Sequence, residues 1–305
     1  MTLLEEFETN HEALLALERQ QFKKAQSLFA ENAKRNPSHQ TLNNLGVFLF
    51  EEGFECKNGK IVNCIQRGLR CLLKSSEIKA TKTNYSAIAK AYDLRSYYVT
   101  CKEKKEMYEK SCYYLQRAQE LEYTYEDAYN LIRQNYLLDS IEIKHLSELK
   151  RISAEYPCSE TARMYLQLLV DCSYKAEGIL CINQFRDFLE ITDLLMFYTK
   201  FEMFEEAYKC CESAVEQFDI DIYTASAIIE SCVKTDHNIA AKEYARIFEE
   251  RLDGQMLKKR QWKMVLSNTD YTSFIRNHYI FMYKDNPPFI DSCYYFGCNM
   301  HNTAW

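Results

Sequence analysis

The scarcity of chain-breaking residues constrains this sequence more than any other feature. Only 7 glycines and 4 prolines occur in 305 residues. A sheet of many strands needs tight turns, which these two residues supply, so the sequence disfavours such a sheet. It favours helices joined by short polar connections. Hydrophobic residues make up 47% of the chain, as in globular rather than disordered proteins. The expected fold class is all-α.

Three segments repeat one pattern of small and bulky residues. They are "FKKAQSLFAENAKRNP" (22–37), "YEKSCYYLQRAQELEY" (108–123) and "FEEAYKCCESAVEQF" (204–218). In the first, Ala25 and Phe29 follow Phe22 at intervals of three and four. At this helical spacing, small residues let two helices approach closely, and bulky ones fill the gap to the next helix.

The segments that precede these repeats also share a pattern. "LNNLGVFLFEEG" carries Gly46 and "NYSAIAKAY" carries Ala89, each at a small position midway along the expected helix. Ala13 occupies the equivalent place earlier in the chain. A helix with a small residue midway, followed by a helix with an Ala-x3-Phe phrase, resembles the tetratricopeptide repeat (TPR). The resemblance covers most of residues 9–250 and implies an irregular α-solenoid of antiparallel helical pairs.

The chain also departs from the pattern of the TPR family. The small positions Ala13, Gly46 and Ala89 and the next equivalent, Arg133, are spaced by 33, 43 and 44 residues, against about 34 in the usual repeat. We expect longer helices or loops near residues 54–60 and 98–107 to absorb the surplus. The large Arg133 predicts an irregular unit, and residues 140–190 show helical periodicity without the signature.

The sequence predicts three regions. No linker rich in proline, glycine or serine interrupts residues 1–254, which we interpret as one TPR-like helical repeat domain. Residues 255–286 are expected to form a capping helical element whose polar outer face shields the last pair. Two successive prolines then end the helical body, leaving a tail rich in cysteine and aromatic residues at 287–305.

Charge and targeting signals narrow the classes of partner. The formal net charge is −6, and the most basic stretch, residues 257–263, is interpreted as a solvated helix face, so no nucleic acid partner is expected. No stretch approaches 18 consecutive apolar residues, and the N-terminus lacks the features of a signal peptide. The 13 cysteines are odd in number and mostly occupy apolar helical positions. We therefore expect a cytoplasmic protein with reduced cysteines and no membrane partner.

Catalytic motifs are missing from the sequence. The six histidines lie in no known catalytic pattern, and neither a Gly-x-Ser-x-Gly motif nor a His-Glu-x-x-His motif occurs. With so few glycines, a phosphate-binding loop is not expected either. The sequence therefore predicts a protein that is not an enzyme and has no cofactor.

Binding is the better-supported role. The TPR resemblance implies a concave groove lined by the first helix of each pair, where an extended peptide or a partner helix can lie. The groove-facing positions that it implies are Asn43, Val47, Ser86, Lys90, Asn130 and Gln134. Asparagine and lysine side chains there can hydrogen-bond a peptide backbone or a terminal carboxylate, although the family's carboxylate clamp is incomplete. The predicted function is a protein-interaction scaffold or peptide-binding module with a protein or peptide partner.

The tail leaves alternatives open. Cys293, Cys298 and His301 offer metal ligands within nine residues, but a structural zinc site needs a fourth. The tail also resembles, in composition only, a peptide that enzymes modify. The third interpretation is a packed end, with the aromatic residues 294–296 on the last helices. The alternative functions are a carrier or precursor with a modified or metal-binding tail, and a regulator that acts through protein partners alone.

Overall fold

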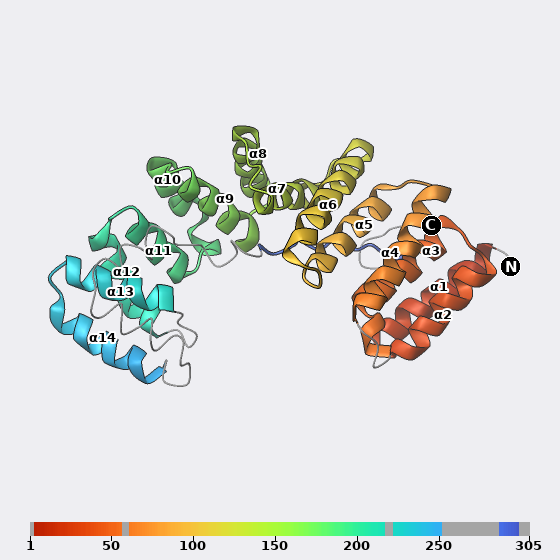
Figure 1. Cartoon of the computed structure of the whole chain (residues 1–305), viewed down its shortest axis with the longest axis horizontal. Helices are drawn as coiled ribbons and strands as arrows, with labels where there is room; N and C mark the ends of the chain where they lie inside the picture. Colours follow the sequence, from red (N-terminus) through yellow and green to blue (C-terminus); the bar gives the residue numbers. More distant parts are fainter. Residues whose placement is uncertain (1–2, 57–60, 217–221, 252–286, 299–305) are drawn as a thin grey trace. The chain divides into compact units, whose positions relative to one another are not determined.

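The computed structural model describes residues 3–56, 61–216, 222–251 and 287–298 (Figure 1). Every regular element within these ranges is a helix, which confirms the predicted all-α class. The chain divides into two compact units. Unit 1 comprises residues 1–142 and 289–305, and unit 2 comprises residues 143–288.

Unit 1 is built from consecutive helices that pack against one another. They are α1 (Leu3–Glu18), α2 (Phe22–Arg35), α3 (His39–Glu51), α4 (Ile61–Ile78), α5 (Lys82–Ser96), α6 (Cys101–Leu121) and α7 (Tyr125–Leu137), with the short 3-10 helix η1 (Gly53–Cys56) after α3. The closest packing joins α1 to α2, α3 to α4 and α5 to α6. These are the helical pairs that the sequence predicts.

Two glycines allow the close approach of α3 and α4. A Cβ atom added to Gly68 would lie 2.7 Å from the carbonyl oxygen of Gly46, and one added to Gly46 would lie 2.7 Å from Cγ of Leu72. A side chain at Gly68 would press on the backbone of α3, and one at Gly46 would displace the Leu72 side chain. In the next pair, the Ser111 hydroxyl of α6 donates to the carbonyl of Ala89 on α5 at 3.0 Å. The small positions predicted from the sequence therefore lie at the contacts between paired helices.

The surplus residues of the second and third repeats lie where the sequence predicts them. Helix α2 has 14 residues, whereas α4 has 18 and α6 has 21. The 3-10 helix η1 adds a further turn between α3 and α4. Longer second helices and one longer connection thus account for the wide spacing.

Apart from α3 and α5, the described first helices of the pairs end in one recurring turn. Each of these turns holds one residue in the left-handed region at φ between 53° and 61°: Gln20, Asp139, Ser173, Glu202 and Asp236. The residue that follows donates its N–H to a carbonyl five positions back at 2.8 Å, as the Gln21 N–H does to Ala16. This is the Schellman arrangement, which satisfies carbonyls left open at a helix end. Only α3 and α5, before the longer connection and the longer α6, lack it among the described first helices.

Arg133 replaces the small residue on α7 and is buried. Its Nη1 atom lies 2.7 Å from Oδ1 of Asp93 on α5, and the Gln134 amide donates to the same oxygen at 2.6 Å. A buried charge is retained only when it is paired and hydrogen-bonded, so the polar contact between α5 and α7 takes the place of close helix packing.

Unit 2 continues the helical pattern. Its helices are α8 (Ile143–Glu155), α9 (Ser159–Asp171), α10 (Lys175–Phe185), α11 (Ile191–Lys200), α12 (Phe204–Val215), α13 (Ile222–Lys234) and α14 (Asn238–Arg251), with the 3-10 helix η2 (Arg186–Phe188) after α10. A buried ion pair between Arg163 and Asp193, 2.9 Å between Nε and Oδ2, links α9 to α11. Residues 140–190, which lack the repeat signature, are therefore helical as expected.

The predicted capping element at 255–286 lies outside the described residues. The division at residue 254 stays a prediction. Among the helices that the structure describes, none combines the length and the apolar character needed to cross a bilayer.

Candidate functional site

Residues 289–298 of the tail belong to unit 1 and pack against its helices. We call this segment the docked tail; Figure 1 draws it in blue, at the opposite end of the colour scale from the helices it contacts. It contains no helix and no strand. The expectation that the aromatic residues 294–296 pack on the last helices is wrong, because Tyr294 and Tyr295 join the core formed by α1–α6. No local pattern in the sequence specifies a contact between segments this far apart.

Asparagine side chains hold the main chain of the docked tail. On α7, the Asn130 amide donates to the carbonyl of Ile290 at 2.9 Å, and its oxygen accepts the N–H of Ile290 at 3.0 Å. On α3, Asn44 makes the same pair of contacts to Phe296, at 3.2 Å and 2.9 Å. An amide that both donates to and accepts from one residue recognises its backbone regardless of the side chain.

Two more asparagines complete this arrangement. Asn43 donates to the carbonyl of Tyr294 at 2.6 Å, and Asn10 on α1 donates to the carbonyl of Phe296 at 3.0 Å. We call the face lined by Asn10, Asn43, Asn44, Lys90 and Asn130 the tail-binding face.

The asparagines of the tail-binding face also orient one another. The Asn44 amide donates to Oδ1 of Asn10 at 2.6 Å, and the Asn84 amide of α5 donates to Oδ1 of Asn43 at 3.1 Å. The side chains in this network are all buried: Asn10, Asn43, Asn44 and Asn84. Because an unsatisfied buried amide is costly, this network fixes which amide atoms point toward the tail.

The side chains of the docked tail enter apolar surroundings. Tyr294 is 2% exposed and Tyr295 is 9% exposed. The Tyr295 ring stacks on Phe29 of α2, with ring centroids 5.7 Å apart and planes inclined by 17°. Burial raises the pKa of both phenols well above the ordinary value. The uncharged phenol is therefore the form that the face accommodates.

Lys90 provides the positive charge of the tail-binding face. Its ammonium forms an ion pair with Asp291 of the docked tail and a second with Glu51, 3.0 Å from Oε1. It also lies 5.6 Å from the centre of the Tyr294 ring. Burial raises the pKa of Glu51, and the nearby Lys90 opposes that rise. Lys90 is thus held in place by Glu51 of α3 as well as by the docked tail.

Aromatic rings at the two ends of the docked tail contact a guanidinium group and an imidazole ring. The Arg133 guanidinium lies 5.7 Å from the centre of the Phe289 ring. The Phe296 ring meets His39 of α3 edge-on, at 5.6 Å between centroids. The tail is therefore contacted along its length, from Phe289 on the α7 side to Phe296 beside α1 and α3.

The six groove positions implied by the resemblance fall into three groups. Asn43, Lys90 and Asn130 contact the docked tail directly, as described above. Val47 is buried in the same apolar core as Tyr294 and Tyr295. Ser86 donates to Asp127 at 2.9 Å, and Gln134 bonds to Asp93, so these two link neighbouring helices instead. Binding of an external ligand at any of the six stays a prediction.

The sequence contains a signal for one contact residue that the prediction missed. Asn43, Ser86 and Asn130 each stand three residues before the small position of their helix or its equivalent. Asn10 has the same relation to Ala13 and contacts the tail as Asn43 and Asn130 do, whereas Ser86 bonds to Asp127. Asn44, Phe29 and His39 have no such signal, because their role depends on where the tail lies.

The predicted metal ligands are only partly described. Cys293 and Cys298 are half-buried in the docked tail, and His301 lies outside the described residues. Burial, with a hydrogen bond to Cys298, raises the pKa of the Cys293 thiol to about 12. Among the described residues, no group of three or more histidine, cysteine, aspartate or glutamate side chains is arranged to hold a metal ion.

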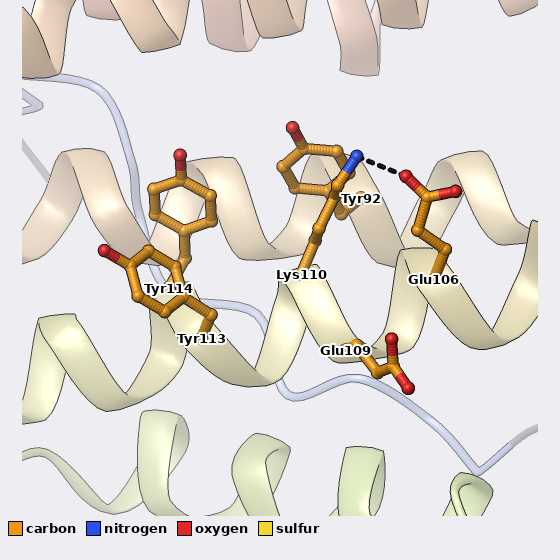
Figure 2. Close-up of a pocket in the computed structure, with 6 residues that line it drawn as sticks. All are labelled: Tyr92, Glu106, Glu109, Lys110, Tyr113 and Tyr114. Carbon is orange, nitrogen blue, oxygen red and sulfur yellow. Dashed lines mark hydrogen bonds and ion pairs between the residues drawn. The ribbon is translucent and has the colours of Figure 1, made fainter.

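A separate shallow pocket of about 370 Å³ lies on α5 and α6. Figure 2 shows its lining residues: Tyr92, Glu106, Glu109, Lys110, Tyr113 and Tyr114. The Lys110 ammonium lies 5.5 Å from the centre of the Tyr92 ring and 2.6 Å from a carboxylate oxygen of Glu106. The chain's own cation thus already occupies both the ring face and the carboxylate.

Comparison with known proteins yields likenesses among solved structures alone. No family model and no curated protein matches the chain. Among solved structures, the chain is similar to one described as the TPR2AB-domain:pHSP90-complex of yeast Sti1. The two are 14% identical, the match covers 89% of this chain and 98% of the other, and the TM-score is 0.31. The paired helices of the structure itself, rather than this likeness, carry the conclusion about the fold.

Proposed function

We propose that this chain is a non-catalytic protein-interaction module whose tail-binding face recognises an extended polypeptide segment. The observation that carries the proposal is the set of hydrogen bonds from Asn10, Asn43, Asn44 and Asn130 to the main chain of the docked tail. Side chains from three different helices, α1, α3 and α7, converge on one stretch of backbone that has no regular structure. Such an array binds a peptide by its main chain, as in other modes of extended-peptide recognition.

The geometry of the tail favours an interaction module over a modified carrier. A carrier whose tail is processed by enzymes needs that tail to be accessible, with exposed thiols. Residues 289–298 are instead packed on unit 1, and Cys293 and Cys298 are half-buried. The cytoplasmic location and the exclusion of nucleic acid stay predictions from the sequence.

The test is binding of a peptide in trans. The host is the full chain with Tyr294→Ser and Tyr295→Ser, which removes the tail's own anchors and leaves the tail-binding face intact. The ligand is a fluorescent peptide of residues 287–298 with both cysteines replaced by serine, followed by fluorescence anisotropy. We expect saturable binding to this host.

Two further variants of the host identify the site. Adding Asn44→Ala and Asn130→Ala should abolish the binding, because both two-bond contacts to the backbone are lost. Adding Asn135→Ala should not, since Asn135 lies on α7 but donates to Leu131 of its own helix. Failure of the peptide to bind the host, or binding that survives loss of both asparagines, would overturn the proposal.

A further inference from the structure

The docked tail also shows which side chains the tail-binding face accepts. Beyond the main-chain contacts, the face presents an aromatic subsite, a cationic subsite and two ring contacts at the ends. These differ in burial and in charge, so they differ in how strongly they select a ligand. The inference that follows rests on the proposed function and names the chemistry of the partner.

The aromatic subsite encloses two successive residues. Tyr294 and Tyr295 are both buried, and the backbone bends at Tyr295 and turns at residues 296–297. The core of unit 1 therefore encloses both rings. Tyr295 is stacked on Phe29, and Tyr294 lies in the same core as Val47. Small polar residues here would leave this apolar surface unfilled.

The cationic subsite lies three residues earlier along the segment. Lys90 contacts Asp291, whose side chain is 64% exposed. Because Lys90 is also held by Glu51, it stays in place whichever residue the segment presents. An exposed ion pair selects weakly, but a lysine or arginine at this position would face Lys90 as a like charge.

The ends of the segment add two aromatic contacts. Phe289 lies against the buried Arg133, which Asp93 holds in place, and Phe296 meets His39. A guanidinium over a ring favours an aromatic residue over an aliphatic one of similar size.

We infer that the partner of the tail-binding face is a peptide segment with an aromatic pair three residues after an acidic one, and with an aromatic residue two before the acidic one. The partner must also displace the chain's own tail, because residues 289–298 occupy every one of these subsites. The tail is covalently attached, so it competes for the face at a high effective concentration. A partner binds only if its affinity and concentration together overcome this competition. A second copy of this chain carries such a segment, and so would an unrelated protein with the same pattern.

A peptide panel tests this selectivity on the Tyr294→Ser, Tyr295→Ser host. The reference is the peptide of residues 287–298 with both cysteines replaced by serine. Three other peptides are derived from the reference. The first carries both Tyr294→Ser and Tyr295→Ser, and the second carries Asp291→Lys. The third has the composition of the reference in scrambled order. We expect loss of the tyrosine pair to weaken binding by about 100-fold or more, because each buried ring contributes about 10-fold or more. Charge reversal at Asp291 should weaken it by about 2- to 5-fold.

The outcomes separate the two proposals. If all four peptides bind with equal affinity, the face reads only the main chain; the inference fails while the proposed function stands. If none binds, the proposed function fails as well. A control host with Tyr98→Ser, an exposed tyrosine of unit 1, should keep its tail docked and bind the reference peptide at least 10-fold more weakly than the test host.

A second measurement uses the unaltered chain, in case the tyrosine variants fold poorly. Excess reference peptide should displace the tail and increase alkylation of Cys293, quantified by mass spectrometry of the digested protein. The peptide without the tyrosine pair should have no such effect. Equal release by both peptides, or by neither at saturating concentration, would contradict the inferred selectivity.

Discussion

At the scale of single residues, the tail is held by amides whose contribution is measurable. Asn130→Ala removes two hydrogen bonds to Ile290. At about 1 kcal/mol each, the loss should weaken docking of the tail by about 1–3 kcal/mol. Amide hydrogen exchange of residues 289–298 should accelerate accordingly. Asn135→Ala on the same helix should leave that exchange unchanged, and equal effects of the two substitutions would argue against a specific role for Asn130.

The Cys293 thiol should report whether the tail is docked. Its pKa is raised to about 12 by burial, from an ordinary value of 9.0. A raised pKa means that docking favours the neutral thiol, so its contribution to docking is present below pH 9 and is lost as the pH rises toward about 12. At pH 8 we expect iodoacetamide to alkylate Cys293 at least tenfold more slowly than the exposed Cys101.

Release of the tail should remove this protection. In the Tyr294→Ser, Tyr295→Ser chain, Cys293 should react at a rate close to that of Cys101. Rapid alkylation of Cys293 in the unaltered chain would show that the tail is not docked in solution.

At the scale of helices, the crossing of α3 and α4 depends on two glycines. Gly68→Ala places a methyl group 2.7 Å from the Gly46 carbonyl oxygen. This distance is too short, so the backbone must move to accommodate the methyl group. Overpacking of this kind costs about 1–3 kcal/mol, which exceeds the gain of up to about 1 kcal/mol from replacing a helical glycine. The expected result is faster amide exchange in α3 and α4 and a lower Tm.

Gly53→Ala is the matched control for this crossing. A Cβ at Gly53 meets its nearest neighbours at 3.5 Å, an ordinary contact. The substitution should therefore be tolerated. A Gly68→Ala chain as stable as the unaltered protein would show that the two helices are not this close.

The recurring turn after the first helices offers a stabilising substitution. Gln20 and Glu202 adopt positive φ without being glycine. A left-handed conformation costs a residue with a Cβ atom about 1 kcal/mol, so Gln20→Gly and Glu202→Gly should each raise the free energy of unfolding by up to that amount. Tyr97→Gly, at a helix end with φ of −71°, should give no gain. Urea unfolding of the three variants tests this, and destabilisation by all three would contradict it.

At the scale of the whole molecule, the last described segment completes the first unit. A chain that ends at residue 288 keeps all of unit 2 and loses Tyr294 and Tyr295 from the core of unit 1. Each buried ring contributes about 1.5–3 kcal/mol, so the helices α1, α3 and α5 should lose amide protection. The helices of unit 2, to which none of residues 289–298 belongs, should keep theirs and serve as the internal control.

Uniform loss of protection in both units would contradict this division. So would full protection of α1, α3 and α5 without the tail, because the tail would then contribute nothing to the core of unit 1.

The helices and their pairing were predictable because their determinants are local. Few chain breakers, apolar residues at helical spacing, and small residues such as Gly46 and Ala89 act within one helix or between neighbours. Asn43, Lys90 and Asn130 were selected by their place in that repeat, and the same register would have added Asn10. The capping element and the metal hypothesis at His301 stay predictions.

Only the tertiary structure decided where the tail lies and what surrounds it. The contact between Asn10 and Phe296 spans 286 positions, and that between Asn130 and Ile290 spans 160. Periodicity carries information about a residue's own helix and its neighbours, whereas a tail with no regular structure has no period to match. Its place depends on complementarity between a folded surface and a segment. The partner chemistry inferred from Tyr294, Tyr295 and Asp291 therefore came from the fold, while the helices that present it came from the sequence.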